Sequence, residues 1–70
     1  MKIAVVYDGK IRQVLDIEDL SQLPDTFTFE VDGQQVIKHR SEIKLLKFNT
    51  EVQVGDIYVP GKGIFRFVGA

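Results

Sequence analysis

The segment "TFTFEVDG" (26–33) constrains the fold more than any other part of the chain. Apolar and polar residues alternate along it, which is the pattern of a strand that buries one face. Asp32-Gly33 then supplies the left-handed backbone angles of a tight two-residue hairpin turn. Such a turn sets Phe29 opposite Val36, so we predict a β-hairpin here with its apolar side chains on one face.

A second Asp-Gly pair, Asp8-Gly9, separates "KIAVVY" from "KIRQVLDI" and predicts another hairpin. We expect a three-residue loop, which sets Tyr7 opposite Ile11 and Ile3 opposite Leu15. This register collects the larger apolar side chains on one face of the sheet, which favours it over its neighbours.

The segment "DIEDLSQLPD" joins the two hairpins and predicts a short helical turn over 17–23. Asp16 is suited to cap its start, where the acidic residues that follow favour the helix dipole. Leu15 and Leu20 have the spacing of a hydrophobic staple, and Pro24 ends the segment. We expect this piece to cover one end of the sheet.

The segment "SEIKLLKF" (41–48) fits two structures. Ser41 could cap a helix, whereas Ile43 and Leu45 alternate with Lys44 as in a strand. We favour the strand, because the flanking segments are strands and a helix this short is marginal.

The C-terminal part predicts a third hairpin. Its strands are "VQVGDIYV" and "IFRFVG", and "PGKG" (60–63) joins them. Pro60-Gly61 fits the middle of a type II turn, because proline presets one backbone angle and glycine accepts the positive one.

About six short strands, tight turns and one short helical turn indicate a mainly all-β protein with a single domain over 1–70. We predict a small antiparallel barrel or curled sheet, SH3-like or OB-like, because closure also protects strand edges. The alternative is an α+β, β-grasp-like arrangement, but a helix of two turns covers little sheet. The residues expected in the core are Ile3, Val5, Leu15, Phe27, Phe29, Val36, Val54, Ile57, Phe65 and Phe67.

The chain has 70 residues, near the lower limit for a single hydrophobic core. A core of this size supplies only about 3–5 kcal/mol of net stability. The sequence has no cysteine and one histidine, His39, which excludes disulfides, thiolate metal sites and imidazole-rich metal sites. We therefore expect no metal and no cofactor. Self-association is the remaining source of stability, and it predicts a homo-oligomer or a heterologous protein partner.

The longest uninterrupted apolar run extends from Ile3 to Tyr7 and is too short to span a membrane. Asp8 interrupts it before it reaches the length of a signal peptide. We expect no membrane partner and a cytoplasmic location.

Gly61-Lys62-Gly63 invites comparison with phosphate-binding and RNA-binding motifs. A P-loop needs Gly-x-x-x-x-Gly-Lys followed by Ser or Thr and a helix, but here Asp56 replaces the first glycine. "KGIFRFV" departs from the RNA-recognition signature at Ile64, where an aromatic residue belongs, and at Phe65, where a small one belongs. We interpret the segment as the tip of a hairpin.

The stretch "HRSE" contains the residue types of a hydrolase triad, His39, Ser41 and Glu42. On a strand, residues two apart are separated by about 6.5–7 Å, so a direct Ser–His hydrogen bond requires a special bend. No Gly-x-Ser-x-Gly motif surrounds the serine. We place Tyr7 and Tyr58 at the rim of the core, and we expect no enzyme, because a barrel this small leaves little room for a substrate cleft.

The two halves of the chain differ in charge. Residues 1–35 contain three Lys/Arg and seven Asp/Glu (−4), whereas residues 36–70 contain six and three (+3), which together give the net charge of −1. Such an asymmetry fits either a nucleic-acid-binding face or a charge-complementary protein contact.

Two functions therefore remain. The first is a non-enzymatic protein–protein interaction or assembly module, acting by self-association or on a protein partner. The alternative is a small barrel that binds single-stranded nucleic acid, which the net negative charge disfavours. Its candidate phosphate contacts are Lys38, Arg40, Lys44, Lys47, Lys62 and Arg66.

The C-terminal segment "VQVGDIYV…GIFRFVG" resembles a hairpin found in many small SH3-like and OB-like barrels, including some phage head–tail and tail proteins. The resemblance implies that an assembly module could be a phage-type structural subunit. It implies no particular site residue.

Overall fold

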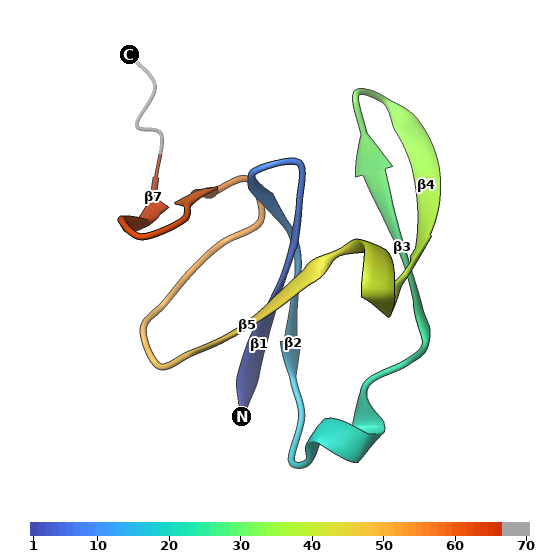
Figure 1. Cartoon of the computed structure of the whole chain (residues 1–70), viewed down its shortest axis with the longest axis horizontal. Coiled ribbons are helices and arrows are strands. Elements are labelled where there is room, and N and C mark those ends of the chain that lie inside the picture. Colours follow the sequence, from blue (N-terminus) through green and yellow to red (C-terminus); the bar gives the residue numbers. More distant parts are fainter. Residues whose placement is uncertain (67–70) are drawn as a thin grey trace.

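The computed structural model describes residues 1–66 and consists mainly of two antiparallel sheets. The larger sheet curls into a half-barrel with the strand order β5-β1-β2-β6-β7 (Figure 1). Its strands are β1 (Lys2–Tyr7), β2 (Lys10–Asp16), β5 (Lys44–Phe48), β6 (Ile57–Val59) and β7 (Gly63–Phe65). The smaller sheet is the hairpin of β3 (Thr26–Val31) and β4 (Gln34–His39). Two single-turn 3-10 helices, η1 (Leu20–Gln22) and η2 (Arg40–Glu42), complete the described part.

This architecture confirms the predicted mainly β fold with an antiparallel, curled sheet. Within residues 1–66 the sheet does not close, because β5 and β7 each pair with a neighbour on one side only. No α-helix occurs within residues 1–66, so the β-grasp-like alternative is wrong.

The β3–β4 hairpin has the predicted register, with Phe29 opposite Val36 and Thr28 opposite Ile37. Its turn residues Asp32-Gly33 both have positive φ angles, 50° and 81°. The turn chemistry and the alternation of the strand therefore agree, and together they set the register.

The β1–β2 hairpin differs from the prediction at its tip. Asp8-Gly9 form a two-residue turn with φ angles of 54° and 76°, and Tyr7 lies opposite Lys10 rather than Ile11. The expected three-residue loop is wrong, because an Asp-Gly pair is itself enough for the tight turn.

A β-bulge restores the predicted register farther along these strands. Val5 lies opposite Gln13 whereas Val6 lies opposite Ile11, so Arg12 is an extra residue on β2. Ile3 therefore faces Leu15 as expected. A side-chain hydrogen bond stabilises the bulge: the Nε of Arg12 donates to the backbone oxygen of Tyr7 at 2.9 Å.

The core lies on both faces of β1, whose four central residues are all buried. On one face, the buried residues Ala4, Val6 and Ile11 contact Leu46, Phe48, Val52, Tyr58 and Ile64. On the other face, Val5, Phe27 and Phe29 contact Tyr7, Leu15, Leu23, Val31, Val36, Ile43 and Leu45. The β3–β4 hairpin thus covers one face of β1, and the curl of the main sheet covers the other.

The predicted core is correct for its N-terminal part and wrong for its C-terminal part. Ile3, Val5, Phe27 and Phe29 are buried, and Leu15, Val36 and Ile57 are half-buried. Val54 and Phe65 are 65% and 49% exposed, which contradicts the prediction. Phe67 lies outside the described residues.

The expected strand "VQVGDIYV" is interrupted, which explains the exposure of Val54. The backbone N–H of Asp56 donates to the oxygen of Gln53 at 3.1 Å, and Gly55 has a φ angle of +99°. These are the features of a type II turn with glycine at its third position. Only Ile57–Val59 remain as strand β6, and the turn directs the Val54 side chain to the surface.

The exposure of Phe65 follows from the register of the C-terminal hairpin. Tyr58 lies opposite Ile64, and both pack against the core. Because neighbouring residues on a strand point to opposite faces, Phe65 and its partner Ile57 lie on the other face, where Ile57 is half-buried and Phe65 is exposed. The turn itself is as predicted, with the N–H of Lys62 donating to the oxygen of Val59 at 3.0 Å. The Gly-Lys-Gly segment therefore forms a hairpin tip.

The remaining local predictions are partly confirmed. Segment 44–48 is a strand. The helical turn over 17–23 is present but shorter, and its cap is Asp19, which forms a capping box with Gln22. Asp16 instead accepts a hydrogen bond of 3.4 Å from the N-terminal amino group. The expected staple is absent, since Leu20 is 54% exposed.

Candidate functional site

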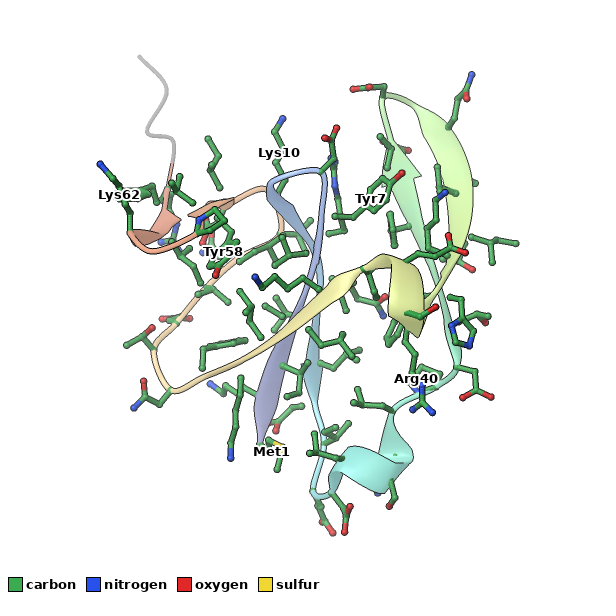
Figure 2. The ribbon with its side chains drawn as sticks, viewed as in Figure 1. Met1, Tyr7, Lys10, Arg40, Tyr58 and Lys62 are labelled. Carbon is green, nitrogen blue, oxygen red and sulfur yellow. The ribbon has the colours of Figure 1, made fainter. Side chains whose placement is uncertain are left out.

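The six predicted phosphate contacts do not form one surface. Lys38 lies on β4, Arg40 on η2, and Lys44 and Lys47 on β5. Lys62 lies in the β6–β7 turn and Arg66 follows β7. Figure 2 shows Arg40 and Lys62 on opposite sides of the molecule.

Three of these six cations are paired with carboxylates. Lys38 lies 3.6 Å from Glu42, and Arg40 lies 3.6 Å from Asp25. Arg66 lies 3.2 Å from Asp56, a carboxylate that is only 4% exposed. These carboxylates would compete with phosphate for the same donors. Among residues 1–66, the candidates without such an ion pair are Lys44, Lys47 and Lys62.

An open groove of about 620 Å³ lies beside the β1–β2 turn, between the start of β5 and β6. Its lining residues are Val6, Tyr7, Asp8, Gly9, Glu42, Ile43, Lys44, Tyr58 and Pro60. The sequence placed both tyrosines at the core rim, and the structure adds that they line this groove. The groove therefore combines two aromatic rings with charged groups of both signs.

A lysine lies over each tyrosine ring. The Nζ of Lys38 is 5.4 Å from the ring centroid of Tyr7, and the Nζ of Lys44 is 5.3 Å from that of Tyr58. Such cation–π contacts hold the lysines close to the surface and orient the rings. Lys38 also contacts Glu42, so it links the rim of the groove to the end of η2.

A second hollow, of about 310 Å³, lies at the opposite end of β5 and is lined by Lys47, Phe48 and Asn49. Both hollows thus lie beside the same edge strand, one at each end. Between them, Leu45 and Leu46 are half-buried, because each packs into one of the two cores. The strand is therefore fixed by its side chains while one backbone edge stays free.

His39 and Ser41 do not lie on one extended strand as expected, so the separation for a strand does not apply. Their Nδ1 and Oγ atoms lie 2.8 Å apart, because η2 supplies the bend that an extended strand would lack. The same Nδ1 accepts a hydrogen bond of 3.1 Å from the backbone N–H of Ser41. Glu42 pairs with Lys38 rather than with the histidine. The arrangement is a helix cap made by an imidazole, and among the described residues only Ser41 hydrogen-bonds the ring.

Asp56 organises the C-terminal hairpin. Its carboxylate accepts hydrogen bonds from the Arg66 side chain and from the backbone N–H of Gln53. Its own backbone oxygen accepts from Ile11 at 2.8 Å, which ties the turn before β6 to β2. The hydrogen bonds from Arg66 and Gln53 lower the pKa of Asp56 below its usual value of 3.8. The negative charge of Asp56 therefore has a structural role, because it holds the C-terminal hairpin together.

Within residues 1–66, no cluster of three or more His, Cys, Asp or Glu side chains has the geometry to hold a metal ion. The same residues include no helix that is long and apolar enough to cross a membrane. No protein family model, no curated protein and no solved structure matches the chain.

Sequence reasoning did not find the groove or the free edge. The groove is made by three segments that are distant in sequence and become neighbours only when the sheet curls. That β5 is an edge strand follows from its pairing with β1 alone. A local pattern cannot supply either fact, because sheet order is a property of the whole chain.

Proposed function

We propose that this chain is a non-enzymatic module that assembles with another polypeptide, either a second copy of itself or a heterologous protein. The observation that carries the proposal is the open edge of the curled sheet at β5, flanked by a hollow at each end. Exposed strand edges are templates for pairing with another chain. We also propose that the module acts in the cytoplasm, and a phage-type structural subunit is one form that it could take.

Exposed apolar side chains also support a protein partner. Ile37 on β4 is 70% exposed, and Val54 and Phe65 in the C-terminal segment are 65% and 49% exposed. A small core gains stability when such surface is buried against a partner, by simple mass action. The open sheet and these side chains therefore favour assembly over an isolated monomer.

The alternative, binding of single-stranded nucleic acid, has weaker support. Base stacking requires accessible aromatic faces next to free cations. Here Lys38 and Lys44 lie over the two tyrosine rings, and the carboxylates of Asp8 and Glu42 line the same groove. Phosphates would meet these carboxylates before they reached a continuous basic surface.

One experiment separates the two functions. Sedimentation velocity over a micromolar concentration series measures self-association, and a fluorescent oligonucleotide is titrated at low and high salt. We expect a concentration-dependent dimer or larger species, or a monomer that does not bind the oligonucleotide near physiological salt.

The decisive variant is Lys44→Glu/Lys47→Glu/Lys62→Glu, because these three candidates have no ion pair within the described residues. A monomer that binds the oligonucleotide tightly, with a salt dependence that this variant abolishes, would replace our proposal with the alternative. The matched control, Lys38→Gln/Arg40→Gln, removes cations that are already paired.

A further inference from the structure

The edge of β5 differs from the other edge of the main sheet. Strand β7 has only three residues, whereas β5 has five and is held by Leu45 and Leu46 in the two cores. Its five residues pair with β1 on one side, and the order of the sheet ends there on the other. A rigid, free backbone edge of this length can accept a further strand.

The charge around β5 is not uniform along the strand. At its C-terminal end, Lys47 lies opposite Ile3 of β1, and Lys2 lies opposite Phe48. Alternate residues point to opposite faces, so these two lysines lie on opposite faces of the sheet near this end, Lys47 on the edge strand itself and Lys2 on the neighbouring strand β1. Neither forms an ion pair within residues 1–66. This end can therefore receive carboxylates.

The N-terminal end of β5 has a different character. The groove there is lined by Asp8, Glu42 and Lys44, and Lys38 pairs with Glu42 at its rim. Two cations and two carboxylates balance, so no net charge remains to attract an acidic residue. A lysine lies over one face of each tyrosine ring, but the rest of Tyr7 and Tyr58, together with Pro60, lines the groove with apolar atoms. This end suits an apolar side chain.

A second copy of β5 is a poor occupant of this edge. The strand reads "KLLKF" and contains no carboxylate, so antiparallel pairing of two copies would bring four lysines of β5 together. Like charges on neighbouring strands are destabilising. Lysines on an edge strand are a common defence against self-pairing, which leaves a segment of opposite charge as the fitting partner.

We propose that the free edge of β5 binds an extended, acidic segment of another protein by antiparallel strand addition. The carboxylates of this segment pair with Lys2 and Lys47, and an apolar residue about four positions farther toward its C-terminus enters the tyrosine-lined groove. The order follows from antiparallel pairing, which joins every pair of described strands in this sheet and is the more stable kind per residue. This inference rests on the proposed protein-binding function and names its surface and its partner chemistry.

The test uses the full chain and two synthetic peptides of nine residues with capped ends. One has two glutamates near its N-terminus and a leucine four positions later, in a background of alternating valine and threonine. The other has the same composition in reversed order. Amide NMR spectra of the isotope-labelled chain locate the contact, and the titration gives its affinity. We expect the first peptide to bind with the largest shifts in β5, and the reversed peptide to bind at least about threefold more weakly.

Charge variants test the lysines. Lys47→Glu and Lys2→Glu should each weaken binding of the first peptide about three- to tenfold, because an attraction becomes a repulsion. Lys47→Arg should retain it. Lys62→Glu is the matched control, since it makes the same change of charge in the β6–β7 turn, away from β5, and should change the affinity less than twofold. All these side chains are on the surface, so circular dichroism should show folded variants.

Several results would overturn the inference: no binding of either peptide, equal binding of both, or shifts centred on β4 or β7. Displacement of the peptide by an oligonucleotide of equal charge at physiological salt would assign the lysines to phosphate instead. The proposed assembly function is tested separately, by sedimentation. If the peptides fail but sedimentation shows self-association, the chain is still an assembly module that uses another surface. A monomer that binds neither peptide but binds the oligonucleotide tightly refutes both proposals.

Discussion

Replacing Phe29 tests the arrangement of the two sheets directly. Its side chain is 6% exposed and contacts the core that joins the β3–β4 hairpin to β1. Its ring centroid lies 5.5 Å from that of Tyr7, at an interplanar angle of 46°. Phe→Ala in a core costs about 3–5 kcal/mol, and loss of an aromatic pair accounts for about 0.5–1.5 kcal/mol of such a cost. A chain of this size has only about 3–5 kcal/mol of stability, so Phe29→Ala should be largely unfolded at 25 °C.

A milder variant makes the same point quantitatively. Phe29→Leu keeps most of the apolar volume and should lower the free energy of unfolding by about 1.5 kcal/mol or less. At about 4–8 °C per kcal/mol for a domain this small, the melting temperature should fall by several degrees. The matched control is Ile37→Ala, because Ile37 lies on the same hairpin, points to its other face and is 70% exposed. Its effect should stay within about 0.5 kcal/mol.

Thermal and guanidinium unfolding followed by far-ultraviolet circular dichroism measure these changes. Phe29→Ala with an unchanged melting temperature would refute the packing of the hairpin on β1. Equal destabilisation by Phe29→Leu and Ile37→Ala would refute the assignment of the two hairpin faces, because only one of these faces is buried in the structure.

Two further predictions concern the turns. Asp56 has a lowered pKa in the folded chain, so its charge stabilises the fold above the unfolded-state pKa, and this contribution is lost as the pH falls through the folded value. Asp56→Asn should therefore be less stable than the natural chain at neutral pH but lose less stability below about pH 4, as urea unfolding at several pH values will show. Gly33 has a φ angle of +81° with open space around a Cβ position, so Gly33→Ala should cost about 1 kcal/mol through the backbone alone. Chemical synthesis with D-alanine at this position should restore the stability, and equal loss with both enantiomers would show that the cause is not the backbone angle.

Local chemistry was enough to predict the turns. Asp32-Gly33 and Pro60-Gly61 each restrict the backbone angles of their own residues, so no distant contact is needed to place these hairpins. The strand "TFTFEV" likewise shows which side chains enter the core, because its alternation is complete. Where residue identity and alternation agreed, the register was correct.

The burial of β1 on both faces agrees with its sequence. The run from Ile3 to Tyr7 is continuously apolar, which is the pattern of a strand covered on both faces. Assigning one face only left Ala4 and Val6 out of the predicted core, although both are buried.

Other features required the whole chain. Nothing in "KIRQV" marks Arg12 as a bulge, because the extra residue is set by the competition between the tight turn and the pairing farther along. Which side chains of the last hairpin face the core depends only on its register. A shift of one residue would put Phe65 on the core side in place of Ile64. The sequence favoured the larger phenylalanine, whereas the turn geometry placed the isoleucine inside.

The candidate site could not be predicted from the sequence because it depends on the order of the strands, which leaves one edge of the sheet open. β1 is the strand with four buried residues in a row, and within residues 1–66 no strand lies beyond β5. The backbone groups along that edge are therefore left for solvent or for another chain. The lysines of β5 oppose pairing with a copy of the same strand, and the hollows at its two ends have different charge. On our proposal, such an edge would select its partner by charge and by direction, which is a form of specificity that needs no deep pocket.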